Sequence, residues 1–405
     1  MQIRAFQPWR PANDLAPRLS CPPYDVVSTA EARAAAAGNA MCFFHVSRAE
    51  IDLPDDTPST APEVYARAAA NWRAFRERGW MVREDAPRLY VYRLRAGGHS
   101  QTGLVALCLA DDYDRGVIRR HENTRQATED DRTRHIEALN AQSGPVFLAH
   151  RGRPDIDALA AAVQAGAPLH DFDAPDGVRH TVWTVPDPAP FVRAFAGLDG
   201  AYVADGHHRA AAAARVARAR RAPGAQPGNA ESDWFLAVLF PAGQLRILPY
   251  NRVARDLNGL APDAFLRRVR GLFEVSEDAP PAPPAPGRAA MYLGGRWYGL
   301  AWGPPPAHDP VAALDVSVLQ NRLLGPVLGI DDPRLSDRIA FVGGIRGADE
   351  LRRRVDAGEA AVAFSLYPTS VAQLLDVSDA GRTMPPKSTW FEPKLRSGLF
   401  VHALD

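Results

Sequence analysis

The sequence predicts a mixed α/β fold, in which strands alternate with helices along a chain of 405 residues. Short apolar runs such as 88–95 and 102–110 have the length and the aromatic and branched residues of strands. In other segments, such as 62–80, apolar residues recur every three or four positions, as on one face of a helix. Strands interleaved with helices indicate an α/β architecture.

In the first part of the chain the elements follow from these patterns and from turn residues. We expect a helix over 29–37, the helix over 62–80, a hairpin of 88–95 and 102–110 joined at Gly97 and Gly98, a helix over 129–142 and a strand at 145–150. Thr128 and Asp131 have the spacing of a capping box at the start of the helix over 129–142.

In the second part the same reasoning predicts a helix over 156–165, a strand at 201–204, an alanine-rich helix over 207–220, a helix over 316–324, a strand at 361–368 and a helix over 369–381. The apolar runs 232–240 and 244–253 are expected to pair with each other. The proline-rich segment 278–288 is the clearest linker. We expect three regions: an N-terminal α/β region at 1–115, a core at 116–277 that precedes this linker, and a C-terminal α/β region at 289–405 that follows it.

Composition excludes several classes of protein. The 47 basic and 47 acidic residues balance, which argues against a protein that coats nucleic acid or an anionic membrane. No apolar run approaches the length of about 18–20 residues that spans a bilayer, and the first residues lack a signal-peptide pattern. The three cysteines form neither a disulfide framework nor a metal pair. We therefore expect a cytoplasmic protein without a redox cofactor.

The strongest chemical signal is the turn Asp205-Gly206-His207-His208-Arg209 between a strand and a helix. Cationic side chains at a helix start oppose the macrodipole by about 0.3–1 kcal/mol each, and a bound anion reverses that cost. Glycine lets the backbone approach a ligand. The turn therefore predicts a phosphate site, with solvated basic residues as the alternative. Adjacent histidines rarely share one metal ion, because neighbouring helical residues point about 100° apart.

The sequence ADGHHR after a strand resembles the second box of the ParB/sulfiredoxin-like superfamily, and most closely the DGHHR motif of free serine kinases. The resemblance implies a ParB/sulfiredoxin-like nucleotide-binding core with large N- and C-terminal elaborations. His207 stands where sulfiredoxin has its cysteine, which excludes that chemistry. A strand pair follows the box in place of a helix-turn-helix, which argues against DNA partitioning.

Seven motifs together resemble a bacterial family numbered 1015 among the domains of unknown function. They are PPYDVVS, RHENT, DGHHR, DVSVLQ, IAFVGG, YPTSVAQ and MPPKSTWFEPKLRSGL, and they extend from about residue 22 to residue 400. The family supplies no reaction, so the reaction has to come from the site.

The resemblance to serine kinases implies roles for the loop that carries RHENT. Glu122 corresponds to the catalytic glutamate, and a carboxylate there can accept the proton of an attacking hydroxyl. His121 could contact phosphate or tune that carboxylate, and Asp205 could act in catalysis by holding Mg²⁺ or by orienting the histidines. The expected cofactor is ATP or ADP with Mg²⁺. The alternative is that Glu122 is only an exposed loop acid.

Four further residues are weaker candidates for substrate binding. Tyr24 and Asp25 follow two prolines, and Asp25 could bind substrate or magnesium or simply cap a turn. Arg252 ends a strand and could reach a substrate carboxylate. Lys387 follows two prolines and could contact phosphate; it and Lys394 are the only lysines among the 47 basic residues.

Three functions are compatible with these residues. The first is a phosphotransferase that uses a nucleotide and acts on a small hydroxyl-bearing molecule, such as serine or a hydroxy acid. The second is a nucleotide-gated, ParB-like regulatory protein, and the third is a phosphatase or nucleotidase that uses the same pocket. The expected partners are a nucleotide and a small substrate, with a homodimer as the candidate assembly and no nucleic acid.

Overall fold

A computed structural model describes residues 1–303 and 309–405, which form two compact units. The first unit comprises Met1–Leu245 and Pro393–Asp405, and the second comprises Arg246–Glu392. This division differs from the one expected from the proline-rich segment 278–288. That segment lies inside the second unit, where it connects two strands of one sheet.

The first unit is built on a nine-stranded mixed sheet with the order β6-β11-β8-β12-β5-β4-β10-β9, and with β1 paired to β5. Its strands are β1 (Ile3–Arg4), β4 (Tyr90–Ala96), β5 (His99–Leu109), β6 (Ile118–Arg119), β8 (Val146–His150), β9 (His170–Asp173), β10 (Arg179–Thr184), β11 (Ala201–Asp205) and β12 (Trp234–Pro241). The pairs β6–β11 and β8–β12 are parallel and the others are antiparallel. Every residue of β8 and β12 is buried, because helices cover both faces of the sheet.

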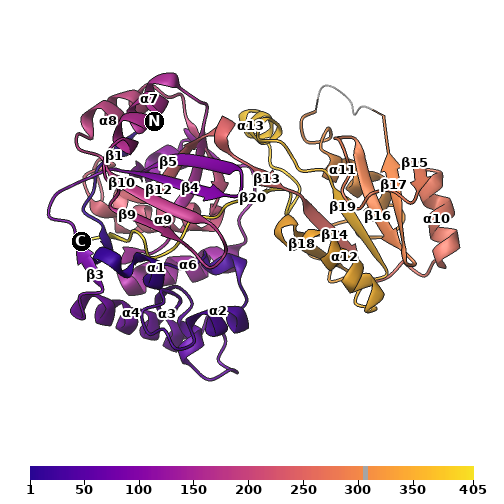
Figure 1. The fold of residues 1–405 in the computed structure, drawn as a ribbon, viewed down its shortest axis with the longest axis horizontal. Helices are drawn as coiled ribbons and strands as arrows, with labels where there is room; N and C mark the ends of the chain where they lie inside the picture. The colour runs from indigo at the N-terminus through magenta and orange to yellow at the C-terminus, as the bar shows by residue number, and fades with distance from the viewer. Residues whose placement is uncertain (304–308) are drawn as a thin grey trace. The chain divides into compact units, whose positions relative to one another are not determined.

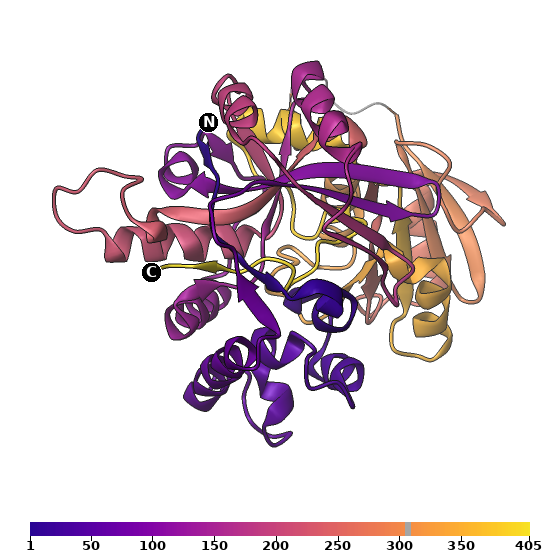
Figure 2. The ribbon, with the colours of Figure 1, turned by 60° about the vertical axis from the view of Figure 1, so that its left-hand side comes forward.

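Helices lie on both sides of this sheet (Figures 1 and 2). On one side are α7 (Pro154–Gln164) and α8 (Ala189–Ala196), and on the other are α9 (His207–Arg220) and α6 (Gln126–Leu139), which pack on each other. Beyond α6 lie α2 (Thr29–Ala36), α3 (Phe44–Ser47) and α4 (Pro62–Glu77), around a second apolar core. Short α1 (Ala16–Leu19) and α5 (Ala110–Asp114) complete the set. The mixed α/β fold is confirmed.

The C-terminal segment 393–405 belongs to the first unit. Its strand β21 (His402–Ala403) pairs with β7 (Ala141–Gln142). The backbone of Ser397 forms an isolated antiparallel β-bridge with that of Cys21. Gly398 has φ +83, and a Cβ there would lie 2.7 Å from the ring of Phe43. The segment thus follows a tight path that only glycine permits at this position. Near the other terminus, β2 (Trp9–Pro11) pairs with β3 (Met81–Arg83).

The second unit contains a six-stranded antiparallel sheet with the order β15-β17-β16-β19-β14-β18. Its strands are β14 (Tyr250–Ala254), β15 (Glu274–Glu277), β16 (Arg288–Leu293), β17 (Arg296–Ala301), β18 (Ile339–Gly343) and β19 (Val362–Leu366), and β13 (Ile247–Leu248) pairs separately with β20 (Trp390–Phe391). The helices are α10 (Pro262–Arg270), α11 (Asp315–Leu319), α12 (Gly347–Asp356), which packs on the sheet, and α13 (Val371–Asp379). Among the helices of the described residues, none has the length and apolar character needed to cross a membrane.

Two local predictions are wrong, and a third differs only in the type of helix. The run 232–240 pairs with β5 and β8, whereas the run 244–253 forms β13 and β14 and pairs in the second unit, because the chain passes from one unit to the other between them. The helix expected from Glu129 begins at Gln126 with Arg125 at its N-cap, so Thr128 lies inside the first turn and caps nothing. The helix over 316–324 consists of α11 and a π-helical turn over 320–324.

We expect Gly398→Ala to destabilise the first unit by about 2–3 kcal/mol, because the added methyl group clashes with Phe43 and the residue has a positive φ. The matched control is Gly116→Ala, which has φ +74 with open space around it and should cost about 1 kcal/mol. Urea unfolding followed by tryptophan fluorescence measures both. Equal losses in the two variants would show that the C-terminal segment is not held as described.

Candidate functional site

The candidate site forms where two neighbouring parallel strands end. In the pairing of β6 with β11, Ile118 lies opposite Ala201 and Arg119 opposite Tyr202. The carboxyl ends of parallel strands meet at one edge of a sheet. The loop after β6 and the turn after β11 therefore lie side by side, and residues separated by more than 80 positions share one site.

The turn after β11 depends on Gly206. This residue has φ 92 and ψ 33, and a Cβ there would lie 2.9 Å from the guanidinium carbon of Arg209. Helix α9 begins at His207 with no side chain capping its first turn and no acidic residue in it. The first N–H groups of such a helix are oriented to bind an anion.

Glu122 lies beside two buried histidines at this edge. His121, Glu122 and His207 each have one ligand atom within 4.8 Å of those of the other two. The two imidazole rings stand edge to face with their centroids 4.4 Å apart. His121 is 2% exposed and His207 5% exposed, whereas Glu122 is half-buried. The structure thus brings together a carboxylate and two imidazoles from two elements.

Burial keeps these histidines neutral. It lowers the pKa of His121 to about 4, although a hydrogen bond with the backbone of Val203 opposes the shift. Burial, and then the neighbouring His121, lower the pKa of His207 well below its ordinary value. His208 accepts a hydrogen bond from the backbone N–H of Arg125 (3.0 Å), which ties the loop to α9. The start of α9 is therefore less cationic than its sequence predicted.

Asp205 is held between two cations. Its Oδ2 lies 2.7 Å from Nη2 of Arg209, and its Oδ1 lies 2.8 Å from Nζ of Lys394. Although burial opposes ionisation, Lys394 and then Arg209 hold the pKa of Asp205 below its ordinary value. The carboxylate is ionised at neutral pH and both of its oxygens are engaged. It is therefore poorly placed to accept a proton or to bind Mg²⁺ directly.

Arg209 is also committed to the protein. Its side chain is 10% exposed, it donates a short hydrogen bond to the carbonyl of Pro145, and it lies 3.7 Å from the carboxylate of Asp25. Asp25 therefore lies beside the turn as an ion-pair partner of Arg209. The guanidinium carbon of Arg132 lies 4.0 Å from the centroid of the Tyr24 ring, so Tyr24 packs against α6.

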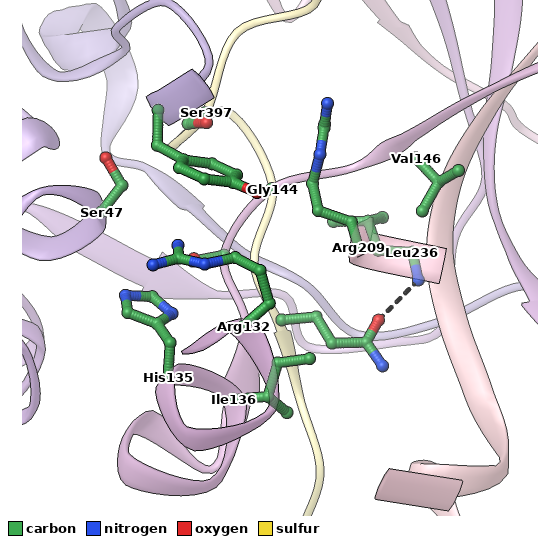
Figure 3. Close-up of a pocket in the computed structure, with 12 residues that line it drawn as sticks. Ser47, Arg132, His135, Ile136, Gly144, Val146, Arg209, Leu236 and Ser397 are labelled. Atoms are coloured by element: carbon green, nitrogen blue, oxygen red, sulfur yellow. Dashed lines mark hydrogen bonds between the residues drawn. The ribbon is translucent and has the colours of Figure 1, made fainter. Parts of the chain in front are cut away.

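A small cavity adjoins this cluster (Figure 3). Arg132 and His135 of α6 lie across it from Arg209. Its volume is about 30 Å³, close to that of one water molecule. Sites for drug-sized ligands occupy about 300–1,000 Å³, so this cavity is too small for a ligand of that size.

The other expected substrate-binding residues lie in the second unit. Arg252 is buried and donates to the carbonyls of Pro386 (3.3 Å) and Lys387 (3.2 Å). Burial lowers the pKa of Arg252 to about 9. The ammonium of Lys387 lies 5.9 Å from the ring centroid of Tyr250. Arg252 and Lys387 thus anchor a loop of that unit.

The lysine that joins the Asp205 cluster is Lys394, which sequence reasoning did not assign to the site. A signal for Lys394 was present, because both lysines of this arginine-rich chain fall in one short segment.

All three cysteines are buried and free.

Solved structures with a similar course of the chain include free serine kinase in complex with AMP, at 13% identity and a TM-score of 0.38, covering 71% of this chain and 86% of that one. Another is SbnI with a C-terminal truncation from Staphylococcus aureus, at 12% identity and a TM-score of 0.39, covering 72% and 85%. A third is a conserved hypothetical protein from Pyrococcus furiosus, at 14% identity and 0.36, covering 72% and 93%. Likeness at this level does not transfer a ligand or a reaction.

The family comparison is more extensive. A family model described as "Protein of unknown function (DUF1015)" matches residues 3–317. No curated protein matches the sequence.

The pairing of Asp205 with Lys394 makes stability depend on pH. Because the pKa of Asp205 is lowered in the folded protein, the contribution is complete above the ordinary pKa of 3.8 and is lost as the pH falls below it. We expect Lys394→Met to cost about 2 kcal/mol at pH 7 and progressively less below about pH 4. Urea unfolding at several pH values measures this, with Lys387→Met as the control. A loss that does not change with pH would contradict the assignment.

Proposed function

The chain belongs to the DUF1015 family, and from the site in its first unit we propose that it is a nucleotide-dependent phosphotransferase that acts on a small hydroxyl-bearing molecule. The single observation that carries this proposal is that Glu122 lies beside the uncapped, glycine-led start of α9. ATP or ADP is the proposed donor, and serine or a similar hydroxy acid is the proposed acceptor.

The donor phosphates would bind at Gly206–Arg209. Backbone N–H groups of the first helical turn and the macrodipole favour an anion there. Gly206 has no side chain to block the approach of a phosphate. Because Asp205 holds Arg209, we assign the direct contacts to the backbone and to His208. Arg209 and Lys394 then act as positioning residues that hold the turn, and the buried ring of His121 packs edge to face on that of His207.

Glu122 would act as the general base. The hydroxyl oxygen of the acceptor attacks the terminal phosphorus and forms a new O–P bond, while its proton passes to the Glu122 carboxylate. The bond from that phosphorus to the bridging oxygen breaks, and its electron pair leaves with the shortened nucleotide. Half-burial gives Glu122 access to an acceptor from solvent, and general bases contribute about 10²–10⁴-fold to such rates.

The magnesium ion that accompanies nucleotide phosphates does not fit at Asp205. Both oxygens of that carboxylate are within 2.8 Å of cationic nitrogens, and a direct bond to Mg²⁺ would leave Lys394 or Arg209 without its partner. No step of the proposed transfer therefore uses a metal held by Asp205.

We expect Glu122→Gln to lower the rate of transfer by about 10²–10⁴-fold with nucleotide affinity nearly unchanged, because the amide cannot accept the proton. The assay combines ATP, ADP or CTP with Mg²⁺ and a panel of hydroxy compounds, and detects phosphorylated acceptor and inorganic phosphate separately. Calorimetry gives the nucleotide affinity. Glu137→Gln, which alters an exposed carboxylate of α6, is the control.

Each alternative outcome has a distinct meaning in that assay. Inorganic phosphate as the sole product would replace transfer by hydrolysis. Nucleotide binding without turnover would point to a nucleotide-gated regulatory protein. Full transfer activity in Glu122→Gln would refute the assignment of the base.

A further inference from the structure

We propose that His121, Glu122 and His207 bind a divalent transition-metal ion, with Zn²⁺ as the representative ion. The three residues come from two elements, the loop after β6 and the start of α9. One nitrogen or oxygen from each lies within 4.8 Å of the others. This inference does not depend on the proposed phosphotransferase activity, because it rests on the positions and chemistry of these side chains alone.

The distances and the donor atoms suit such an ion. Bonds of about 2.0–2.1 Å to zinc place tetrahedral ligands about 3.4 Å apart, so shifts of about an ångström would bring the three atoms into coordination. Two imidazole nitrogens and one carboxylate oxygen are a common set for Zn²⁺, and imidazole also suits iron, nickel and copper. Mg²⁺ prefers oxygen ligands throughout. The donor set therefore selects a transition metal over magnesium.

The hydrogen bonds around His121 orient it for this role. One ring nitrogen is hydrogen-bonded to the backbone of Val203. A neutral imidazole that donates from one nitrogen carries a lone pair on the other. Ligating histidines in metal sites are held in this way, by a hydrogen bond from the nitrogen that does not bind the ion.

His207 supplies an independent observation. Its Nε2 is buried and has no hydrogen-bond partner among the residues that the structure describes. A buried polar atom without a partner costs about 1–3 kcal/mol, so the position requires an explanation. A metal ion bound at this nitrogen would remove that cost.

The neighbouring histidine has a different environment. His208 accepts a hydrogen bond from the backbone N–H of Arg125 through its Nε2 at 3.0 Å. It follows His207 directly in α9, so the two side chains point in different directions. His208 is therefore engaged with the loop through its Nε2, and we do not count it among the ligands of the ion.

The proposed site keeps a position open for a further ligand. Three protein ligands around Zn²⁺ leave a fourth position for water or for an oxygen of a substrate. Glu122 is half-buried, so this side of the site is open to solvent. Glu122 needs only one carboxylate oxygen to bind the ion.

The test is a metal titration of the full-length chain without any histidine tag. After treatment with a chelator, the protein is titrated with Zn²⁺ by calorimetry and with Co²⁺ by visible absorption. We expect one ion per chain with imidazole–carboxylate coordination in the Co²⁺ spectrum. His207→Ala and Glu122→Gln should each weaken binding by about 100-fold or more, since even partners of ligands contribute about 10–100-fold. Glu137→Gln, at an exposed position of α6, should change it less than about threefold.

Circular dichroism of the metal-free variants establishes whether they fold. If His207→Ala does not fold, Glu122→Gln, at a half-buried position, still tests the site. The site would be refuted if the wild-type chain bound neither ion more tightly than its folded variants do. An equal loss of affinity in Glu137→Gln would refute it as well. The titration contains no nucleotide, whereas the transfer assay uses Mg²⁺. Failure of one proposal therefore leaves the result of the other intact.

Discussion

The architecture of the site depends on one carboxylate. Asp205 ends β11 and holds Arg209, four residues later, together with Lys394, which is 189 residues away in the sequence. A partly buried carboxylate between two cations is ionised and rigid, and removing any member leaves a charge with too few partners. This cluster fixes the glycine turn, the start of α9 and the return of the C-terminal segment to the first unit. The side chain that sequence motifs present as a phosphate-binding arginine is thus first of all an internal partner of Asp205.

The part of the site that the sequence predicts best is the part that local rules determine. The strand, turn and helix over 201–220 follow from an apolar run, a glycine and an alanine-rich segment, and the structure has them at β11, Gly206 and α9. The hairpin of β4 and β5 follows from Gly97 and Gly98 in the same way. The proximity of Glu122 to the turn required one further step, the parallel pairing of β6 with β11. Two residues of β6 make that pairing, which is too short for periodicity to reveal.

The features that sequence reasoning missed depend on distant contacts or on burial. Apolar runs that follow each other suggested a strand pair at 232–253, but β12 pairs within the first unit and β14 within the second. Proline content suggested a boundary at 278–288, although a proline-rich loop can equally connect two strands of one sheet. Lys394 reaches Asp205 only because the last 13 residues return to the first unit. The charge of His207 could not be read from its residue type, because burial lowers its pKa.

The neutrality of the histidines connects the two proposals. A helix start with charged imidazoles would attract phosphate by itself, but His121 and His207 are buried and uncharged at neutral pH. The macrodipole supplies only about half a unit charge at this end, and Arg209 is neutralised by Asp205. A divalent ion bound by His121, Glu122 and His207 would add two positive charges against the single negative charge of Glu122. The ion would restore at this edge of the sheet the positive charge that burial removes from the histidines, and an anionic ligand could then bind to the ion and to the start of α9 together.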